Sequence, residues 1–131
     1  MLRGTFRILK ALLVGTVVQN CGLPTDTAQF LNASFLPDAP KPGDAVTLSF
    51  AYALTKPIVS GTALYSVTLN GIPFNTKEDL CTQTSCPKDP GTYIEWSHST
   101  FPQISGKAVS KIQWMDQDNA EVVCIQYTVR V

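Results

Sequence analysis

The strongest constraint on the fold is a period-two alternation of large apolar residues with small or polar ones. It is clearest at 45–54 (AVTLSFAYAL), where every second residue is Val, Leu, Phe or Tyr. Successive side chains of a strand point to opposite faces, so this pattern predicts a strand with one buried face. Similar alternation appears at 65–69, 94–97, 111–114 and 123–131.

Turn-forming residues separate these segments at intervals of roughly 8–12 residues. Asn70-Gly71 is a strong hairpin signal because both residues tolerate positive φ. Pro-rich breakers lie at 37–43 and 87–91, and nine Pro and eight Gly in 131 residues exclude a helical bundle. About six to eight short strands predict an all-β fold in which two antiparallel sheets form a sandwich.

Composition narrows the function classes further. Hydrophobic residues make up 44% of the chain and charged residues only 15%, which is enough apolar surface for a core and excludes a disordered chain. Ten basic and ten acidic residues give zero net charge. Nucleic-acid-binding domains normally carry a basic excess, so we expect no nucleic-acid partner.

Residues 1–20 differ from the rest of the chain. Arg3, Arg7 and Lys10 precede an apolar stretch at 11–18, which is typical of a short secretory signal. The same residues also fit an acid-free amphipathic helix, as in a mitochondrial presequence or a helix on a membrane surface. We therefore expect a targeting segment or amphipathic helix at 1–20 and one folded domain at 21–131, with ordinary structure at 1–20 as the remaining alternative.

The chain has four cysteines, Cys21, Cys81, Cys86 and Cys124. An even number in a small β domain suggests two disulfides, for which three pairings exist. Cys81 and Cys86 would close a tight loop, which leaves Cys21 to reach Cys124 in the last predicted strand. Disulfides indicate an oxidising compartment, either the secretory route or the mitochondrial intermembrane space.

The remaining polar residues argue against an enzyme. His98 is the only histidine, and Glu95 would point to the opposite face of the same strand, so no base–acid pair forms there. The Cys and His spacing does not resemble a zinc site, and the acidic turn at 116–119 lacks the ligand series of a calcium loop. We expect no catalytic residue, no metal and no cofactor. Asn32 begins an Asn-Ala-Ser sequon, a glycosylation site if the chain enters the secretory route.

Several short motifs, in this order and at this spacing, resemble the ML (lipid-recognition) domain family over about 21–131. They are a Pro-rich run at 32–43 (NASFLPDAPKPG), GIPF at 71–74 followed by DLC at 79–81, SCP at 85–87 continuing to PGTY at 90–93, and WMDQD at 114–118 followed by VVCI at 122–125. The resemblance implies an immunoglobulin-like sandwich whose sheets separate enough to admit a lipid. It also implies the pairings Cys21–Cys124 and Cys81–Cys86.

A lipid site needs a dry apolar cavity with a polar rim, so the candidate residues are large side chains expected to face the interior. Ordinary core packing is an equal alternative for each of them, because any β-sandwich fills its core in this way. The candidate lipid-binding residues are Phe50, Tyr52, Leu54, Tyr65, Val67, Leu69, Ile94, Trp96, Phe101, Ile112, Trp114, Ile125 and Tyr127. Tyr93 replaces Ile94 as an inward residue if the strand shifts by one residue. The pairs at 72–73 and 101–102 are candidates for the cavity mouth, or plain turns.

The expected function is binding of a sterol or phospholipid between the two sheets, for transfer or presentation, in the secreted fluid or the endolysosomal lumen. The expected partners are the lipid and a membrane surface. The alternative is a non-catalytic accessory subunit of a membrane complex, with protein partners there, anchored by a helix at 1–20. In that case we expect a mitochondrial location, in the intermembrane space or at the inner membrane.

Overall fold

The structure is a computed structural model that describes residues 15–103 and 105–130. These residues form eight strands and one 3-10 turn, η1 (Leu80–Thr82). The strands are β1 (Gly15–Asn20), β2 (Ala28–Leu36), β3 (Ala45–Leu54), β4 (Gly61–Leu69), β5 (Ile72–Asp79), β6 (Gly91–Thr100), β7 (Lys107–Asp116) and β8 (Glu121–Arg130).

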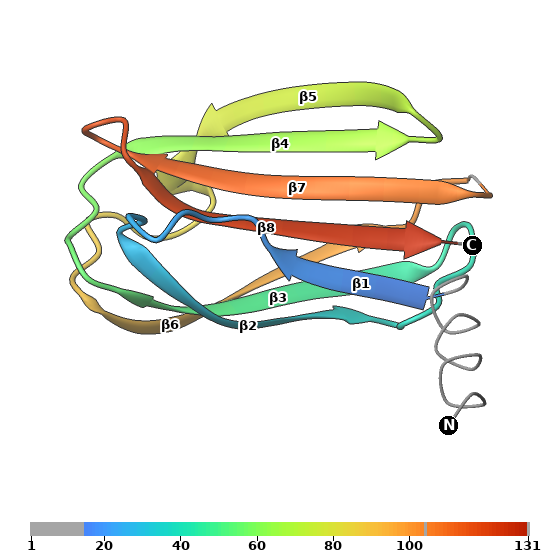
Figure 1. The fold of residues 1–131 in the computed structure, drawn as a ribbon, viewed down its shortest axis with the longest axis horizontal. Coiled ribbons are helices and arrows are strands. Elements are labelled where there is room, and N and C mark those ends of the chain that lie inside the picture. Colours follow the sequence, from blue (N-terminus) through green and yellow to red (C-terminus); the bar gives the residue numbers. More distant parts are fainter. Residues whose placement is uncertain (1–14, 104, 131) are drawn as a thin grey trace.

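The strands form two antiparallel sheets that pack face to face (Figure 1). The larger sheet has the order β1-β8-β7-β4-β5, and the smaller has the order β2-β3-β6. The predicted all-β, two-sheet sandwich is confirmed. Because five strands face three, β5 at the edge of the larger sheet has no strand opposite it in the smaller one among the described residues.

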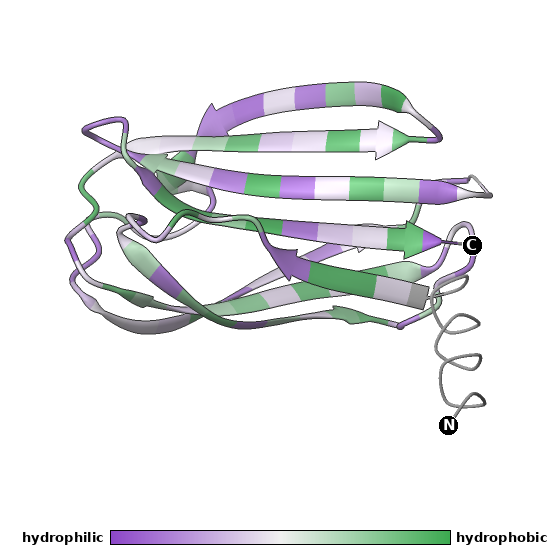
Figure 2. Cartoon of the chain, in the orientation of Figure 1, coloured by the Kyte–Doolittle hydropathy of each residue, from purple (hydrophilic) through white to green (hydrophobic). Residues whose placement is uncertain are grey.

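In the central strands, most of the residues predicted to face the interior are buried. Figure 2 shows alternating hydrophilic and hydrophobic bands along β7. In β3 the side chains of Val46, Phe50, Tyr52 and Leu54 are buried, as the pattern predicts. The hairpin signal at 70–71 is also confirmed, since Asn70 and Gly71 have φ values of 49° and 87° and join β4 to β5.

The first described strand begins before the boundary expected at residue 20. Residues Gly15–Asn20 form β1, which pairs with β8 from Gly15 opposite Arg130 to Asn20 opposite Ile125. In the structure they are part of the larger sheet. Residues 15–18 of the predicted apolar run lie in this strand, since a short apolar stretch fits a helix and an edge strand equally well. The rest of the predicted segment, 1–14, lies outside the described residues.

The face of β6 also differs from the expectation. Ile94 and Trp96 were predicted to face the interior, but they are 58% and 63% exposed. Glu95 and Tyr93 point inward in their place, which is the one-residue alternative. Tyr93 stacks near Tyr52 in the core, and the Glu95 carboxylate accepts a hydrogen bond from the Tyr52 hydroxyl at 2.7 Å. His98 lies exposed on the opposite face from Glu95, as predicted.

The four cysteines form two disulfides, Cys21–Cys124 and Cys81–Cys86. Both pairings implied by the family resemblance are therefore confirmed. The first bond joins the β1–β2 connection to β8 across 103 residues, and the second closes the loop after η1. Among the described residues, no helix is long and apolar enough to cross a membrane.

Candidate functional site

An apolar cavity of about 200 Å³ lies between the two sheets. It occupies the end of the sandwich where β3 and β7 begin and where β4, β6 and β8 end. Both sheets therefore contribute a wall, and the segment after β6 closes one side. The lining residues are Phe35, Val46, Leu48, Val67, Leu69, Ser99, Thr100, Phe101, Pro102, Ala108, Ser110, Tyr127 and Val129.

Most of this wall cannot form hydrogen bonds with a ligand. Its largest polar group, the Tyr127 hydroxyl, already donates to the backbone carbonyl of Ser49 at 3.1 Å. Burial raises the pKa of Tyr127 to about 12, so the hydroxyl stays protonated and neutral near pH 7. The hydroxyls of Ser99, Thr100 and Ser110 are the other polar side-chain groups of the lining. The site can exclude water and hold apolar groups, and it offers no general base.

A second cavity of about 90 Å³ adjoins the first, and Leu48 borders both. Its lining is more polar and includes Gln83, Glu95 and Ser97 together with Phe50, Tyr65 and Trp114. The indole Nε1 of Trp114 is buried and has no hydrogen-bond partner among the described residues. The pair of cavities thus has an apolar end and an end with hydrogen-bonding groups.

The Tyr65 hydroxyl donates to Gln83 Oε1 at 2.8 Å at the edge of the second cavity. Burial, and next the charge of Glu78, raise the pKa of Tyr65. Burial and the hydrogen bond to Glu95 likewise raise the pKa of Tyr52. Both phenols therefore remain neutral donors, and neither is prepared to act as a base.

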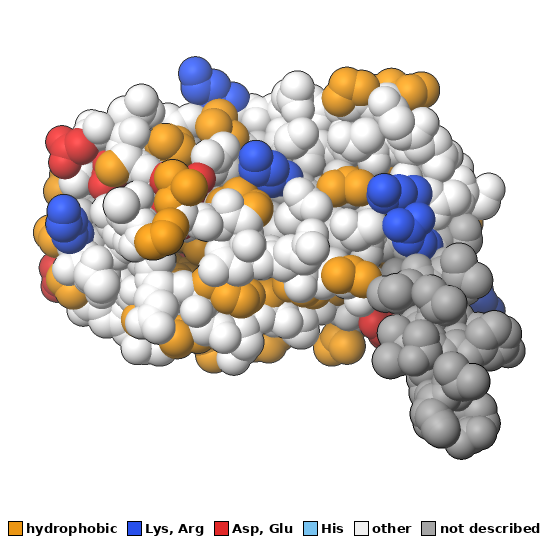
Figure 3. Space-filling view, in the orientation of Figure 1, with side chains coloured by type: hydrophobic (Ala, Val, Ile, Leu, Met, Phe, Trp, Pro, Cys, Tyr) orange, Lys and Arg blue, Asp and Glu red, His pale blue; other side chains and the backbone are white. Residues whose placement is uncertain are grey.

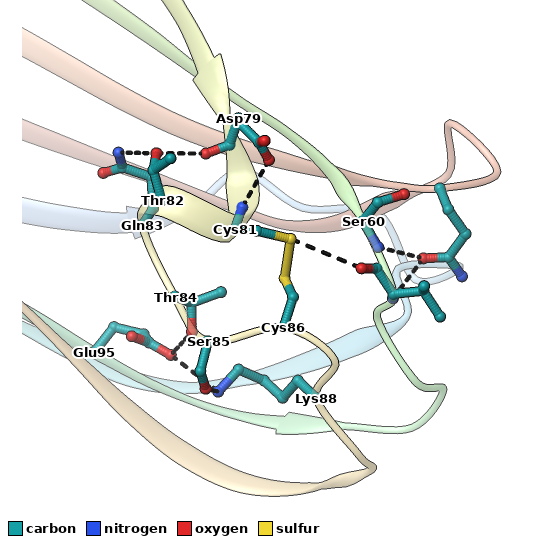
Figure 4. The surroundings of a disulfide bond; sticks show 12 residues. Ser60, Asp79, Cys81, Thr82, Gln83, Thr84, Ser85, Cys86, Lys88 and Glu95 are labelled. Carbon is teal, nitrogen blue, oxygen red and sulfur yellow. Dashed lines mark hydrogen bonds and ion pairs between the residues drawn. A yellow bond between two sulfur atoms is a disulfide. The ribbon is translucent and has the colours of Figure 1, made fainter.

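The loop closed by Cys81–Cys86 lies against β6 and closes the polar end of the sandwich (Figure 4). Thr84 Oγ1 donates to Glu95 Oε2 at 2.9 Å, and the buried Lys88 ammonium lies 3.8 Å from the same oxygen. Lys88 also lies over the Tyr93 ring, 4.0 Å from its centroid. Together with T-shaped packing of Phe50 on Trp114 (5.3 Å), these contacts make this end compact.

Most of the predicted lipid-binding residues line one of the two cavities. Val67, Leu69, Phe101 and Tyr127 line the larger one, and Phe50, Tyr65, Ile112 and Trp114 line the smaller one. Tyr52, Leu54 and Ile125 are instead fully packed in the core and line neither cavity. Ile94 is exposed and lines neither, and Trp96 borders the smaller cavity although most of the residue is exposed.

Several lining residues were not among those candidates. Val46 and Leu48 follow the same alternation as Phe50, so the pattern could have included them, whereas Phe35 lies in β2, whose register is interrupted between Phe30 and Asn32. Ser99 and Ser110 carry no signal, because a small hydroxyl beside a cavity looks like any solvent-facing strand residue. Pro102, one of the mouth candidates, lines the larger cavity, whereas Ile72 lines neither cavity.

The apolar wall continues beyond the cavity onto β5. Leu69 lies opposite Ile72, and Val67 lies opposite Phe74. Paired residues on antiparallel strands point to the same face. Ile72 and Phe74 therefore share the cavity-facing side of the larger sheet, but they are 61% and 55% exposed because the smaller sheet does not extend over them. Figure 3 shows hydrophobic side chains gathered over the β4–β5 end of the molecule.

Comparison with known proteins agrees with this architecture. The model of the ML domain family matches residues 15–131, so the chain belongs to the ML domain family of lipid-binding proteins. The match begins at Gly15, the first residue of β1.

Curated relatives and solved structures extend the comparison. A Dictyostelium discoideum protein named "Putative phosphatidylglycerol/phosphatidylinositol transfer protein 2" is 29% identical over 129 residues, covering 93% of this chain and 90% of its own. A second protein of that organism and description is 27% identical over 121 residues, covering 88% and 86%.

Two solved structures share the fold. A Niemann-Pick type C2 protein from Japanese carpenter ant has a TM-score of 0.65 and 12% identity, with 86% of this chain and 96% of that chain covered. Chicken MD-1 complexed with lipid IVa has a TM-score of 0.65 and 18% identity, with 88% of each chain covered.

Proposed function

We propose that this protein carries a phospholipid, with an acyl chain in the cavity between the sheets and the head group outside. The observation that carries the proposal is the apolar cavity of about 200 Å³ with a wall from each sheet. Two curated relatives have names that describe phosphatidylglycerol/phosphatidylinositol transfer, which favours a phospholipid over a sterol. Chicken MD-1, which shares the fold, is described in complex with lipid IVa.

Burial of hydrocarbon supplies the affinity. Each methylene removed from water contributes about 0.8 kcal/mol, so a sixteen-carbon chain gains roughly 12 kcal/mol before the costs of association and ordering are subtracted. Ligand cavities usually measure about 300–1,000 Å³. The two cavities, at about 200 and 90 Å³, are smaller than this. Binding therefore includes separation of the sheets and movement of Leu48, the residue between the cavities.

The polar end gives the ligand an orientation. A polar group on the buried chain that reaches the smaller cavity would accept a hydrogen bond from Trp114 Nε1, which lacks a partner among the described residues. Satisfying a buried donor is favourable because an unpaired buried polar group is costly. Release to a membrane surface follows the reverse route, through the end of the sandwich that holds the larger cavity.

The test is to fill the cavity from one face of β4. Val67 lines the larger cavity, whereas its neighbour Ser66 points to the opposite face of the sheet. Val67→Phe should reduce phospholipid extraction, because the ring occupies the space of the acyl chain, and Ser66→Phe should leave it unchanged. Native mass spectrometry after incubation with phosphatidylcholine vesicles containing phosphatidylglycerol or phosphatidylinositol measures the retained lipid, and cholesterol-containing vesicles test the sterol alternative. Equal extraction by both variants would contradict the proposed site.

The proposed location is the secretory route, as a secreted or endolysosomal protein. Two disulfides need an oxidising compartment, and both are formed in this fold. The alternative of an accessory subunit of a mitochondrial membrane complex rested on an amphipathic helix at 1–20. Residues 15–20 of that segment form β1, and no observation of the described residues favours the alternative.

A further inference from the structure

The outer face of the smaller sheet carries two exposed apolar residues that the larger cavity does not explain. Ile94 and Trp96, 58% and 63% exposed, point away from the interior on β6. Neither residue lines the larger cavity, because the sheet lies between that cavity and this face, so an acyl chain bound there leaves both side chains in water. Large apolar residues that lie together on a surface usually mark something that covers them.

The face around them contains no charged residue. The pairing register places the outward side chains of β2, β3 and β6, and all of them are Ala, Ser, Thr, Leu, Ile, Trp, Asn, Gln or His. The central strand presents only small side chains, among them Ser49 and Ala51, which are 8% and 7% exposed. This uncharged face combines hydroxyl, amide and imidazole groups with an indole ring. Such a surface suits a neutral ligand that has both hydroxyl groups and apolar C–H surfaces.

A sequon lies on this same face. Asn32 is exposed, lies opposite Ala51, and Ala51 in turn lies opposite Ile94. The adjacent row contains Ser34, Ser49 and Trp96. Neighbouring strands are about 4.8 Å apart, so Asn32 and Ile94 are separated by roughly 10 Å of flat sheet. One or two sugar rings attached to Asn32 would span that distance, with only the Ala51 methyl between.

We propose that Asn32 carries an N-linked glycan whose first sugars lie across Ala51 and cover Ile94 and Trp96. In the modification, the Asn32 amide nitrogen bonds to the anomeric carbon of an oligosaccharide carried on a polyprenyl pyrophosphate. The carbon–oxygen bond to the pyrophosphate breaks, the pyrophosphate leaves with the electron pair, and the amide nitrogen loses one proton to a base. Transfer precedes folding, when the Ser34 hydroxyl is not yet bonded to Ser49 as it is here, at 2.7 Å. The proposal rests on passage through the secretory route and is independent of the bound lipid.

The first test establishes the modification. The full chain is secreted from a eukaryotic host, and its intact mass is measured before and after treatment with a peptide N-glycosidase. The expected result is a mass excess that enzymatic treatment removes and that Asn32→Gln abolishes. A secreted chain without a glycan at Asn32 overturns the proposal.

The second test establishes the packing. Trp114 is 2% exposed, so quenching of tryptophan fluorescence by acrylamide reports mainly on Trp96. The quenching constant should be roughly halved in the glycosylated protein, because the sugars bury the indole, and it should rise after glycan removal or in Asn32→Gln. Trp96→Phe should remove the difference between glycosylated and deglycosylated protein.

A matched control moves the glycan to another face. In an Asn32→Gln background, Lys77→Thr turns the tripeptide that begins at the exposed Asn75 of β5 into a sequon. This variant carries a glycan on the larger sheet, and its quenching constant should equal that of the unglycosylated protein. Equal quenching constants with and without the glycan at Asn32 overturn the proposed packing of the sugars on Trp96. If the quenching of Trp96 instead decreases as the protein concentration rises, a second copy of the chain covers this face. That result also overturns the proposed packing of the sugars.

Discussion

At the scale of single residues, the least expected feature is a pair of neighbouring carboxyl groups. Asp26 Oδ1 and Glu121 Oε2 are both buried and lack hydrogen-bond partners among the described residues. Burial, and next the neighbouring carboxyl group of Glu121, raise the pKa of Asp26 to about 7. A proton on Asp26 makes it a donor to Glu121, which satisfies both oxygens and explains how the fold tolerates the pair.

This pair predicts that stability falls as the pH rises. An aspartate in the unfolded chain has a pKa of about 3.9. Between that value and about 7, the folded state retains a proton that the unfolded state has lost. The unfolding free energy therefore decreases across this window and levels off above it. Thermal unfolding followed by circular dichroism between pH 4 and 8 should show this slope, and Asp26→Asn should flatten it.

The control for this experiment is Asp38→Asn, which removes one carboxylate from an exposed turn. It should leave the slope as in the unmodified protein. An unchanged slope in Asp26→Asn would show that other groups cause the pH dependence.

At the scale of elements, β6 depends on one inward carboxylate. Glu95 accepts hydrogen bonds from Tyr52 and Thr84 and pairs with the buried Lys88 ammonium. Removing one partner of a buried ion pair leaves an uncompensated charge, which costs more than the pair itself contributes. The contacts of β6 with the cystine loop therefore depend on this residue.

Glu95→Ala should lower the unfolding free energy by about 3 kcal/mol, the low end for a buried pair, because the Glu95 side chain is 18% exposed. Urea denaturation measures the change. Glu78→Ala, on the exposed β5, should change it by less than about 0.5 kcal/mol. A loss of similar size in both variants would mean that β6 does not depend on this network.

The same strand shows where prediction from sequence succeeded and where it failed. In β3 the two faces differ clearly, large apolar against small, so the buried face could be predicted. In β6 (GTYIEWSHST) an aromatic residue occurs on each face, and alternation cannot choose between Tyr93 and Trp96. The choice depends on Tyr52, which lies 43 residues before Glu95 in the sequence, and on Lys88 in the loop that precedes β6. For the same reason, polar lining residues such as Ser110 could not be found before the sheets were placed.

At the scale of the whole molecule, the two disulfides differ in what they stabilise. A disulfide lowers the entropy of the unfolded chain more when it closes a longer loop. Cys21–Cys124 closes a loop of 103 residues and Cys81–Cys86 one of only 5. The long loop therefore ties together the ends of the sandwich, while the short one acts locally.

Replacing Cys21 and Cys124 by Ala should cost about 4.7 kcal/mol of unfolding free energy, against about 2 kcal/mol for the same change at Cys81 and Cys86. Since small domains are stable by only about 5–15 kcal/mol, the first variant should be close to unfolding at room temperature. Urea titration of both double variants measures the two losses. Equal losses would contradict the entropic explanation.

The unpaired edge of β6 affects the association of one copy of the protein with another. β6 pairs only with β3 among the described strands, so its second edge presents unpaired backbone groups over ten residues. Such an edge is a template on which another molecule can add a strand and begin a fibril. A strand added beside β6 would have to bury its own side chain against the Glu95 carboxylate, and an inward charge at an edge is one way in which natural sheets resist that addition. The residue that holds β6 in place thus also protects the protein from intermolecular sheet growth.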